Sequence, residues 1–476
     1  MTTLESTRSR LAAAGQDHLL AFHDRLAPPQ QDALLAQINA LDLEAVPALV
    51  RAYVTAKPTP AIPRDVQPAA YYPFNPDAPA RPYNAAQYRA AGDALLRAGK
   101  VGAFVVAGGQ GSRLGYEGPK GCYPAGAVSR KPLFQIFAEQ LLAARTKFGR
   151  VVPWYIMTSP LNHDATTDFF RAHDFFGLGR ENLMFFPQGV MPSFDLASGR
   201  ILLAEPGVVA TNPDGHGGAV RALHSSGALD DMQRRGVEHL SYIQVDNPLV
   251  RITDPVFLGL HAAAPDSSAE MSSKMIPKAY PGEKLGVFCR VDGKTEVIEY
   301  SDLPAALAEE RLPDGTLRFV CGSIAIHVLA VEFIRRLATD PRFALPYHRA
   351  EKKVPCIDPA TGARVEPAAP NGVKLERFIF DALAMCRSSV VYETDRVEEF
   401  APIKNASGLD SPESSARIQT ARAARWLGSR GVRVPRNPAG DPDCTLEISP
   451  LTALEPADLG PDALPRVIER GASLAV

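Results

Sequence analysis

A short apolar run leads directly into a glycine-rich loop near residue 100, and this junction constrains the fold more than any other part of the chain. Residues 101–107 read VGAFVVA, a pattern typical of a strand buried on both faces of a parallel sheet. The loop that follows, residues 108–121, reads GGQGSRLGYEGPKG. Without a Cβ atom, Gly108, Gly109 and Gly111 can take positive φ and let main-chain N–H groups approach a ligand closely. The segment therefore predicts a strand that ends in a phosphate-holding loop.

Arg113 and Lys120 add positive charge to this loop, and two better-known phosphate loops do not fit it. Arginine grips phosphate oxygens with a planar fork, and lysine supplies a mobile point charge. The P-loop of ATPases needs glycine before its lysine and Ser or Thr after it, whereas Lys120 stands between Pro119 and Gly121. The dinucleotide fingerprint needs a third glycine where this chain has Leu114. The sequence therefore indicates a phosphate loop of another kind.

Strand and helix patterns alternate after this loop. We expect strands over residues 151–158, 183–186 and 241–245, and helices from residue 132, over 164–170 and over 219–233. An Asp-Gly pair at residues 292–293 predicts a hairpin between strands 287–291 and 295–300. This alternation is typical of an α/β fold with a mainly parallel mixed sheet.

A chain of 476 residues is long for a single core, so two or three domains are expected, and the patterns divide the chain into three segments. Residues 1–90 are predicted to form an N-terminal helical segment and a proline-rich arm. The prolines fall between residues 58 and 82 and disfavour regular elements there. Residues 91–385 form the predicted α/β domain, and residues 386–476 a small C-terminal domain.

The bulk composition argues against several classes of protein. A formal net charge of −2 without a long basic stripe argues against nucleic-acid binding. No apolar run approaches the length of a membrane span, and the N-terminus lacks a signal-peptide pattern. The six cysteines are dispersed, without the spacing of a zinc site, so reduced thiols and a cytoplasmic location are expected. Cys122, beside the loop, is interpreted as a small packing residue.

The loop resembles the signature of the UDP-sugar pyrophosphorylase family, and most of all that of its UDP-N-acetylhexosamine branch. Further segments resemble that family and occur in the same order: SRKPLFQI at 129–136, FPQG at 186–189, NPDGHGG at 212–218, VDN at 245–247, residues 286–300, PNGVK at 370–374 and PIKN at 402–405. The resemblance extends from about residue 18 to residue 417. Agreement at many unrelated segments in one order argues against chance.

The resemblance implies a Rossmann-like nucleotidyltransferase core that joins UTP and a sugar-1-phosphate into a UDP-sugar and releases pyrophosphate. Asp246 follows the strand-like run 241–245, where a carboxylate can hold Mg²⁺ or cap a turn. The resemblance favours Mg²⁺. The roles that it implies are catalytic for Arg113, Lys120 and Lys404, nucleotide-binding for Gly108, Gly109, Gly111, Gln188, Gly215 and Asp246, and sugar-binding for His216, Gly286, Glu299, Ser323 and Lys374.

Two departures from the hexosamine branch leave the sugar open. His216 and Ser323 stand where that branch has asparagine, and both positions approach the sugar in the family. N-acetylglucosamine-1-phosphate is the leading expectation, with glucose-1-phosphate as the alternative and N-acetylgalactosamine-1-phosphate undecided.

A hypothesis of another class is a UDP-sugar-binding regulator that has lost catalysis. The presence of Arg113, Lys120, Asp246 and Lys404 argues against it. The expected partners are UTP and the sugar-1-phosphate, and the oligomeric state stays open, a monomer included.

Overall fold

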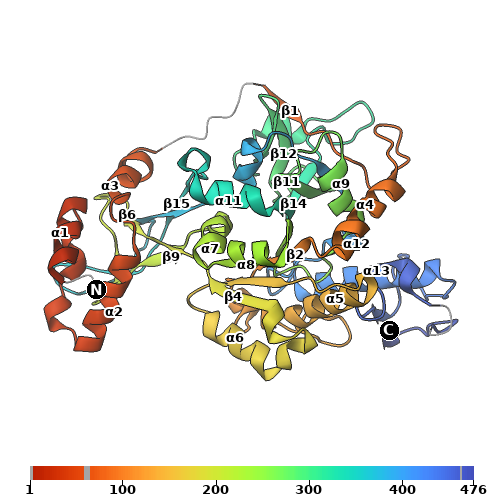
Figure 1. Ribbon diagram of the computed structural model, residues 1–476, viewed down its shortest axis with the longest axis horizontal. Coiled ribbons are helices and arrows are strands. Elements are labelled where there is room, and N and C mark those ends of the chain that lie inside the picture. The colour runs from red at the N-terminus through yellow and green to blue at the C-terminus, as the bar shows by residue number, and fades with distance from the viewer. Residues whose placement is uncertain (1–3, 58–64, 461–463) are drawn as a thin grey trace. The chain divides into compact units, whose positions relative to one another are not determined.

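The computed structural model describes residues 4–57, 65–460 and 464–476 (Figure 1). Contacts between Cα atoms divide the chain into two units. The first comprises Met1–Ala61, Gln188–Ala219 and Leu345–Ile379, and the second comprises Ile62–Pro187, Val220–Ala344 and Phe380–Val476. The domain boundaries expected near residues 90 and 385 stay predictions.

A large mixed sheet forms the centre of the second unit. Its strands follow the order β1-β12-β14-β10-β2-β3-β4, and β11, β13 and β19 pair beside this path. The bounds are β1 Val66–Pro68, β2 Val101–Val106, β3 Trp154–Thr158, β4 Leu183–Pro187, β10 His239–Gln244, β11 Met271–Pro277, β12 Val287–Val291, β13 Lys294–Ile298, β14 Cys321–Ala330 and β19 Val391–Glu393. Strands β10, β2, β3 and β4 are parallel, and β14 runs antiparallel to β10. The expected α/β fold is confirmed.

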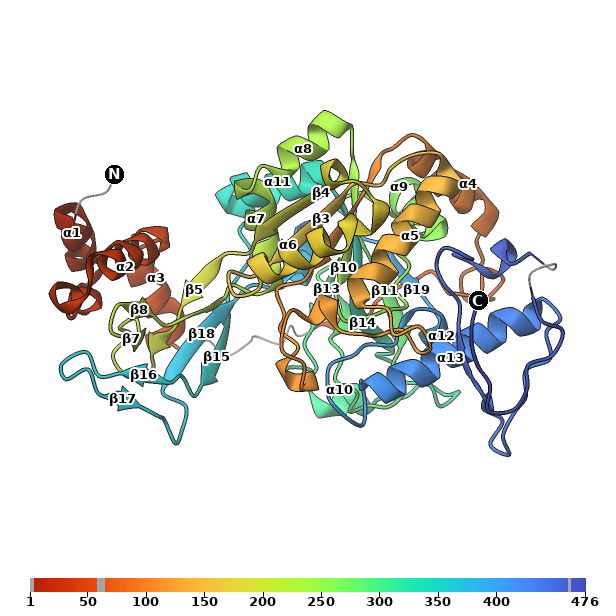
Figure 2. The ribbon, with the colours of Figure 1, turned by 90° about the horizontal axis from the view of Figure 1, so that it is seen from below.

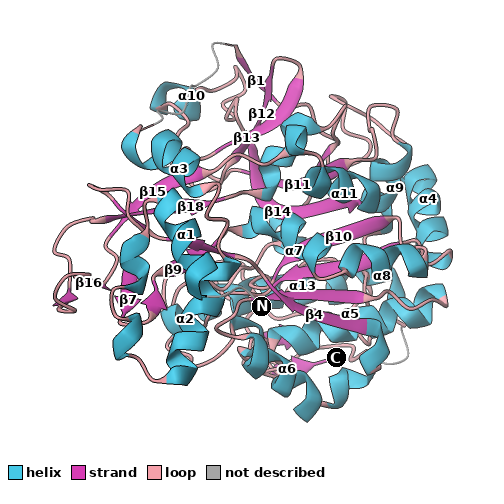
Figure 3. Ribbon diagram, turned by 60° about the vertical axis from the view of Figure 1, so that its left-hand side comes forward, coloured by secondary structure: helices cyan, strands magenta, loops and turns pink. Residues whose placement is uncertain are grey.

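Helices flank this sheet on both sides. Helices α5 (Leu133–Phe148) and α6 (His163–Ala172) lie together on one side of β3 and β4, and α8 (Ala228–Arg235) and α11 (Val331–Thr339) lie on the other (Figure 2). Figure 3 shows β14, β10 and β4 in one layer between such helices. Helix α5 starts directly after Pro132, as expected, and buries its apolar face in the core.

Two glycines allow the helices α4 (Ala85–Arg97) and α9 (Pro255–Ala263) to pack closely. A Cβ atom at Gly92 would lie 1.9 Å from the carbonyl oxygen of Pro255, and one at Gly259 would lie 1.8 Å from that of Tyr88. Any larger residue would force these helices apart. The sequence patterns did not reveal this contact, because glycine inside a helix usually weakens it.

Two local predictions have different outcomes. The hairpin is confirmed, since Asp292 (φ 48°) and Gly293 (φ 79°) both take the left-handed conformation of a primed turn between β12 and β13. The prediction of a single helix over residues 219–233 is wrong. The segment is divided into α7 (Ala219–Ser225) and α8, because Gly227 between them takes φ 78°.

The prediction that the proline-rich arm lacks regular elements is wrong at residues 66–68, which form β1. This short strand pairs with β12 at the edge of the sheet, the position where proline is tolerated. Pro58, Pro60 and Pro63 lie outside the described residues. Farther along the arm, the main-chain N–H of Tyr72 donates to Val391, and its hydroxyl donates to Asp266.

The first unit combines small helices with short sheets. Its elements are α1 Leu4–Ala14, α2 Pro28–Ala40, α3 Val46–Leu49, the π-helical turn Val50–Thr55, β5 Val190–Pro192, β6 Phe194–Asp195, β7 Leu203–Glu205, β8 Val208–Val209, β9 Thr211–Pro213, β15 His348–Lys352, β16 Cys356–Ile357, β17 Arg364–Val365 and β18 Gly372–Glu376. Strand β18 lies between β15 and β6. Apolar residues of the helices and of these strands form one core, which includes Leu34, Phe194 and Val373.

The last part of the second unit has a small core of its own. It is formed around α13 (Pro412–Ser429) and the parallel pair β20 (Thr445–Glu447) and β21 (Ser473–Ala475), with Trp426 and Leu446 buried. The remaining helices of this unit are α10 Ala305–Glu309 and α12 Arg396–Glu399. None of the helices in the described ranges is both long and apolar enough to cross a membrane.

Candidate active site

The glycine loop and Asp246 leave the large sheet at the same edge. In the parallel pair β2 and β10, Val106 is opposite Gln244, and the main-chain N–H of Val245 donates to Val106 at 3.3 Å. Gly108 and Asp246 each come two residues after this pair. Ligands of open α/β sheets bind beyond the carboxyl ends of the strands, so both lie where such a ligand is expected.

Main-chain hydrogen bonds fold the loop back on itself. The N–H of Gly111 donates to Gly118 (2.9 Å), and the N–H of Lys120 donates to Gly109 (3.0 Å). The buried amide of Asn162 donates to the carbonyl oxygens of Ala107 (3.0 Å) and Gly109 (3.2 Å). The loop is therefore a fixed structure before any ligand binds.

The glycines of the loop act differently from what the sequence predicted. Positive φ occurs at Gly115 (67°) and Gly118 (135°), not at residues 108, 109 and 111. A Cβ atom at Gly111 would lie 2.7 Å from the ring of Tyr116, so this glycine is required for packing. At Gly109 a Cβ atom would meet no heavy atom within 4 Å, so the main chain there is open to a ligand.

The two cations of the loop keep their charge available for a ligand. Arg113 is exposed and Lys120 is partly buried. Neither side chain makes a hydrogen bond or an ion pair within the described part of the chain. A cation that no protein carboxylate neutralises is suited to bind phosphate oxygens.

Four of the predicted site residues line one cavity of about 200 Å³ in the second unit: Asp246, Gly286, Ser323 and Lys404. The main-chain N–H of Ser323 donates to Gly286 at 2.7 Å. The Nζ atom of Lys404 lies 3.6 Å from a carboxylate oxygen of Asp410, which is an ion-pair distance. The carboxylate of Glu299 lies next to Gly286, since a Cβ atom on Gly286 would be 3.3 Å from its Oε1.

A buried ionic cluster, formed by Lys274, Asp254 and Glu399, lies behind this cavity. Lys274 is 0% exposed, and its Nζ donates to Asp254 (2.7 Å) and to both carboxylate oxygens of Glu399 (2.6 Å). The carbonyl oxygen of Glu399 accepts from the side chain of Asn247 (2.7 Å), the neighbour of Asp246. The ionic cluster therefore connects the segment that leads to Lys404 with the loop that carries Asp246.

Sequence reasoning missed this cluster. Its only signal was a lysine in the middle of a strand-like run, MSSKMIP over residues 271–277. A lysine at such a position needs carboxylate partners, because an unpaired buried charge is too costly.

The other predicted site residues lie in the first unit. Gln188 is 7% exposed, and Lys374 lies on β18 opposite Ala350. Gly215 takes φ 82°, and a Cβ atom there would lie 2.4 Å from the carbonyl oxygen of Arg377. Glycine is therefore required at this turn, whether or not a nucleotide binds it.

His216 is held as a neutral ring. Its Nδ1 accepts from the main-chain N–H of Ile379 (3.1 Å), and its ring stacks on Phe378 with centroids 5.1 Å apart. Burial, together with the nearby His348, lowers the pKa of His216 to about 4. With Nδ1 as an acceptor, the proton of the neutral ring is on Nε2.

The residues at the sheet edge fit a magnesium ion bound together with phosphates. The described residues contain no group of three or more His, Cys, Asp or Glu that could hold a metal ion by themselves. Mg²⁺ usually takes one or two carboxylates and completes its shell with water and substrate phosphates. Asp246, whose side chain has no protein partner among the described residues, could supply such a carboxylate.

Cys122 follows the loop but is not expected to react. It is 7% exposed, and burial raises the pKa of its thiol to about 12. We expect that 5,5′-dithiobis(2-nitrobenzoate) at pH 8 modifies Cys122 only after unfolding, because the thiolate is the reactive form. Cys444, which is partly exposed, is the internal control. Rapid modification of Cys122 in the native protein, located by mass spectrometry, would contradict this.

Comparisons with known proteins agree with this arrangement. The model of the UTP–glucose-1-phosphate uridylyltransferase family matches residues 66–422. The human UDP-N-acetylhexosamine pyrophosphorylase-like protein 1 is 36% identical over 478 residues, covering 95% of this chain and 93% of its own. The UDP-N-acetylglucosamine pyrophosphorylase of Saccharomyces cerevisiae is 39% identical over 343 residues, covering 71% of each chain.

A solved structure extends the agreement to the fold. The uridine diphosphate N-acetylglucosamine pyrophosphorylase of Trypanosoma brucei aligns with a TM-score of 0.82 at 25% identity, covering 99% of this chain and 98% of that chain. With its mixed α/β sheet and the glycine loop beyond the end of β2, the chain has the nucleotidyltransferase-like fold of this solved relative. The chain belongs to the UTP–glucose-1-phosphate uridylyltransferase family and is a uridylyltransferase enzyme.

Proposed function

We propose that the protein joins UTP and N-acetylglucosamine-1-phosphate into UDP-N-acetylglucosamine and releases pyrophosphate. The observation that carries this proposal is the placement of the glycine loop and Asp246 at one sheet edge, with two cations of the loop left unneutralised. The choice of sugar is supported by the names of the human, yeast and trypanosomal relatives. A cytoplasmic location, in keeping with six free cysteines, is part of the same proposal.

The reaction needs no covalent intermediate with the protein. A phosphate oxygen of the sugar-1-phosphate is already anionic at neutral pH, so it attacks the α-phosphorus of UTP without a general base. The bond from this phosphorus to the bridging oxygen of the β-phosphate breaks, and pyrophosphate leaves with the electron pair. One phosphoanhydride replaces another, so the reaction is nearly reversible.

The chain's own contribution is positioning and charge. The open main chain at Gly109 faces the triphosphate, while Arg113 and Lys120 bind the oxygens of the departing pyrophosphate. Lys404 contributes a further cation from the cavity that also contains Asp246. A Mg²⁺ ion held by Asp246 would neutralise phosphate charge. In this proposal the amide of Gln188 recognises uracil, because an amide offers both a donor and an acceptor.

A panel of sugar-1-phosphates tests the choice of sugar. Initial rates of pyrophosphate release from UTP are compared for the 1-phosphates of N-acetylglucosamine, N-acetylgalactosamine and glucose. We expect the highest kcat/KM with N-acetylglucosamine-1-phosphate. Turnover with glucose-1-phosphate alone would contradict the proposed sugar, and UDP-sugar binding without any turnover would favour a regulator that has lost catalysis.

His216 and Ser323 are expected to tune this selectivity. We predict that His216→Asn and Ser323→Asn together raise the ratio of kcat/KM for N-acetylglucosamine-1-phosphate over glucose-1-phosphate about tenfold, because one well-placed hydrogen bond is worth about 1.4 kcal/mol. Each residue is also changed to alanine as a control for loss of the native side chain. Unchanged ratios in the asparagine variants would remove both residues from the specificity argument.

A further inference from the structure

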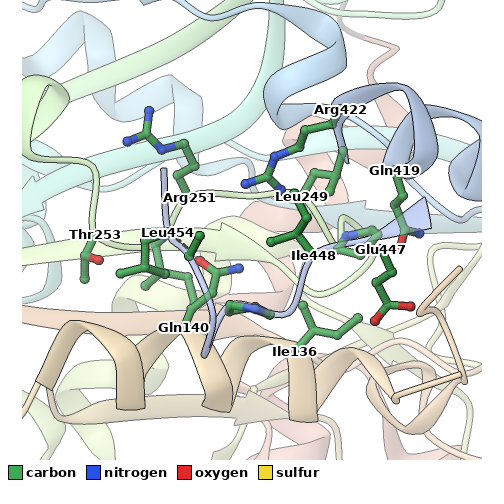
Figure 4. A pocket seen from close by; sticks show the side chains of 14 residues that line it. Ile136, Gln140, Leu249, Arg251, Thr253, Gln419, Arg422, Glu447, Ile448 and Leu454 are labelled. Carbon is green, nitrogen blue, oxygen red and sulfur yellow. Dashed lines mark hydrogen bonds between the residues drawn. The ribbon is translucent and has the colours of Figure 1, made fainter. Parts of the chain in front are cut away.

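A cavity of about 50 Å³ lies between helix α5, the loop of residues 248–253, helix α13 and the segment after β20. Figure 4 shows Gln140 projecting from α5 and Arg422 and Gln419 from α13, with Arg251 on the loop. Since one water needs about 10–15 Å³ of such space, the cavity can hold a group of several non-hydrogen atoms.

The two arginines of this cavity make no side-chain hydrogen bond among the described residues, although each has a carboxylate at ion-pair distance. The guanidinium of Arg251 makes no hydrogen bond within the described residues, and Asp254 lies 3.8 Å from it. The side chain of Arg422 is only 17% exposed. Its Nε is buried without a hydrogen-bond partner among the described residues and lies 3.9 Å from the carboxylate of Glu398. Its guanidinium stacks over the ring of Trp426 at 4.2 Å. The side chain of Arg251 is 26% exposed, so water can reach it, whereas the buried Nε of Arg422 bears the cost of desolvation without a hydrogen bond.

The carboxylates near these arginines are already bound by other groups. Asp254 and Glu399 accept from Lys274 at 2.6–2.7 Å. Glu398 accepts from Arg425 (2.9 Å) and from the indole N–H of Trp426 (2.7 Å).

Two more carboxylates near the arginines, those of Glu455 and Glu447, also have other partners. Glu455 pairs with Lys147 (2.6 Å) and Arg89 (2.9 Å). Glu447, which also lines the cavity, accepts from the main-chain N–H groups of Val128 and Ser129, each at 2.8 Å. These carboxylates accept hydrogen bonds from other donors, so Asp254 and Glu399 act on Arg251 only through space, where, despite burial, they raise its pKa.

Burial lowers the pKa of Arg422 to about 10. The carboxylate of Glu398 opposes this shift, and repulsion from Arg251 adds to it. Arg422 is therefore still charged at neutral pH, and an anion between the two guanidinium groups would relieve their repulsion. Thr253 and Gln140 also line the cavity and can donate hydrogen bonds, Thr253 through its hydroxyl and Gln140 through its amide NH₂. The Oε1 of Gln140 already accepts from the main-chain N–H of Ile252 at 3.2 Å.

We propose that this cavity is a binding site for one small tetrahedral oxyanion, inorganic phosphate or sulfate, held by Arg251 and Arg422. Planar guanidinium forks match the oxygens of such ions and bind them through charge-assisted hydrogen bonds. The site is separate from the glycine loop, and its anion takes no part in the bond changes at the triphosphate. Its floor, residues 248–253, continues the loop that carries Asp246, so a bound anion fixes the base of that loop.

Calorimetric titration of the full-length protein with phosphate at constant ionic strength tests the proposal. The titration is made on a background of Arg113→Ala and Lys120→Ala, which weakens phosphate binding at the glycine loop. We expect one phosphate per chain, with sulfate competing and chloride not competing. Arg422→Gln on the same background should weaken binding at least tenfold, because two charge-assisted hydrogen bonds are lost.

Arg430→Gln is the matched control, because it removes the same charge from an exposed position next to the end of the same helix. It should bind phosphate like the background protein. Equal affinity in the Arg422→Gln and Arg430→Gln proteins, or no phosphate binding in any of them, would overturn the proposal.

A second measurement needs no variant. Crystals of the unmodified protein soaked in selenate should show an anomalous peak between the guanidinium groups of Arg251 and Arg422. Water alone in the cavity at high selenate concentration would contradict the site even if Arg422→Gln fails to fold.

Discussion

Arg113→Ala is expected to lower kcat for uridylyl transfer at least 100-fold without lowering the free energy of unfolding. The catalytic loss follows from the removal of a cation placed at the leaving pyrophosphate, and loss of one preorganised donor to developing charge typically costs a factor of about 10²–10³. The fold should be unaffected, because the side chain is exposed and contacts no hydrogen-bond partner within the described residues.

The measurement combines steady-state kinetics with urea unfolding. Arg145→Ala is the matched control, since Arg145 is an exposed arginine on α5. Arg113→Lys separates charge from geometry, and we expect it to recover only part of the rate because lysine lacks the planar fork. If Arg113→Ala has the kcat of the control, the loop does not bind the leaving group in the way described here.

Lys274→Met is expected to destabilise the protein by about 3–5 kcal/mol, because it leaves Asp254 and Glu399 buried without their counter-charge. The surface pair of Lys100 and Glu238 is the control, and Lys100→Met should cost less than about 1 kcal/mol. Both values come from urea unfolding of the full-length protein.

The buried cluster should also hold the active-site segments in place. Hydrogen exchange in Lys274→Met is expected to increase first at residues 246–247 and 399–404, which are joined through Asn247 and Glu399. Should Lys274→Met fail to fold, Glu399→Gln gives a milder test of the same exchange pattern. A uniform increase over the whole second unit, or a loss of stability no larger than that of Lys100→Met, would contradict the positioning role of Lys274.

The sequence predicted the parts of the fold that depend on local patterns. The buried strand before the loop, the α5 helix after Pro132 and the Asp-Gly hairpin are confirmed, because each depends on residues close together in the chain. The helix break at Gly227 was missed because a single glycine is tolerated in many helices.

Features that depend on distant residues could not be read from the sequence. The contact of α4 with α9 places Gly92 against Pro255 and Gly259 against Tyr88, residues far apart in the chain. Likewise, Lys274 and Glu399 look like ordinary charged residues until the fold places both at 0% exposure.

The candidate site shows the same limit. The sequence predicted that the glycine loop and Asp246 follow the carboxyl ends of strands, and β2 and β10 end at Val106 and Gln244, while the roles of the site residues stay predictions. It assigned positive φ to the wrong glycines, because the conformation of a loop depends on the tertiary contacts that hold it, such as that of Gly111 with Tyr116.

Detection of the two products tests the central claim most directly. The purified protein is incubated with UTP, N-acetylglucosamine-1-phosphate and Mg²⁺, and the reaction is followed by phosphorus NMR, with CTP, GTP and ATP in parallel reactions. We predict that UDP-N-acetylglucosamine and pyrophosphate appear in equal amounts with UTP, and that Arg113→Ala forms both at least 100-fold more slowly. Release of inorganic phosphate without a UDP-sugar, or equal turnover of all four nucleotides, would contradict the assignment of uridylyl transfer to this site.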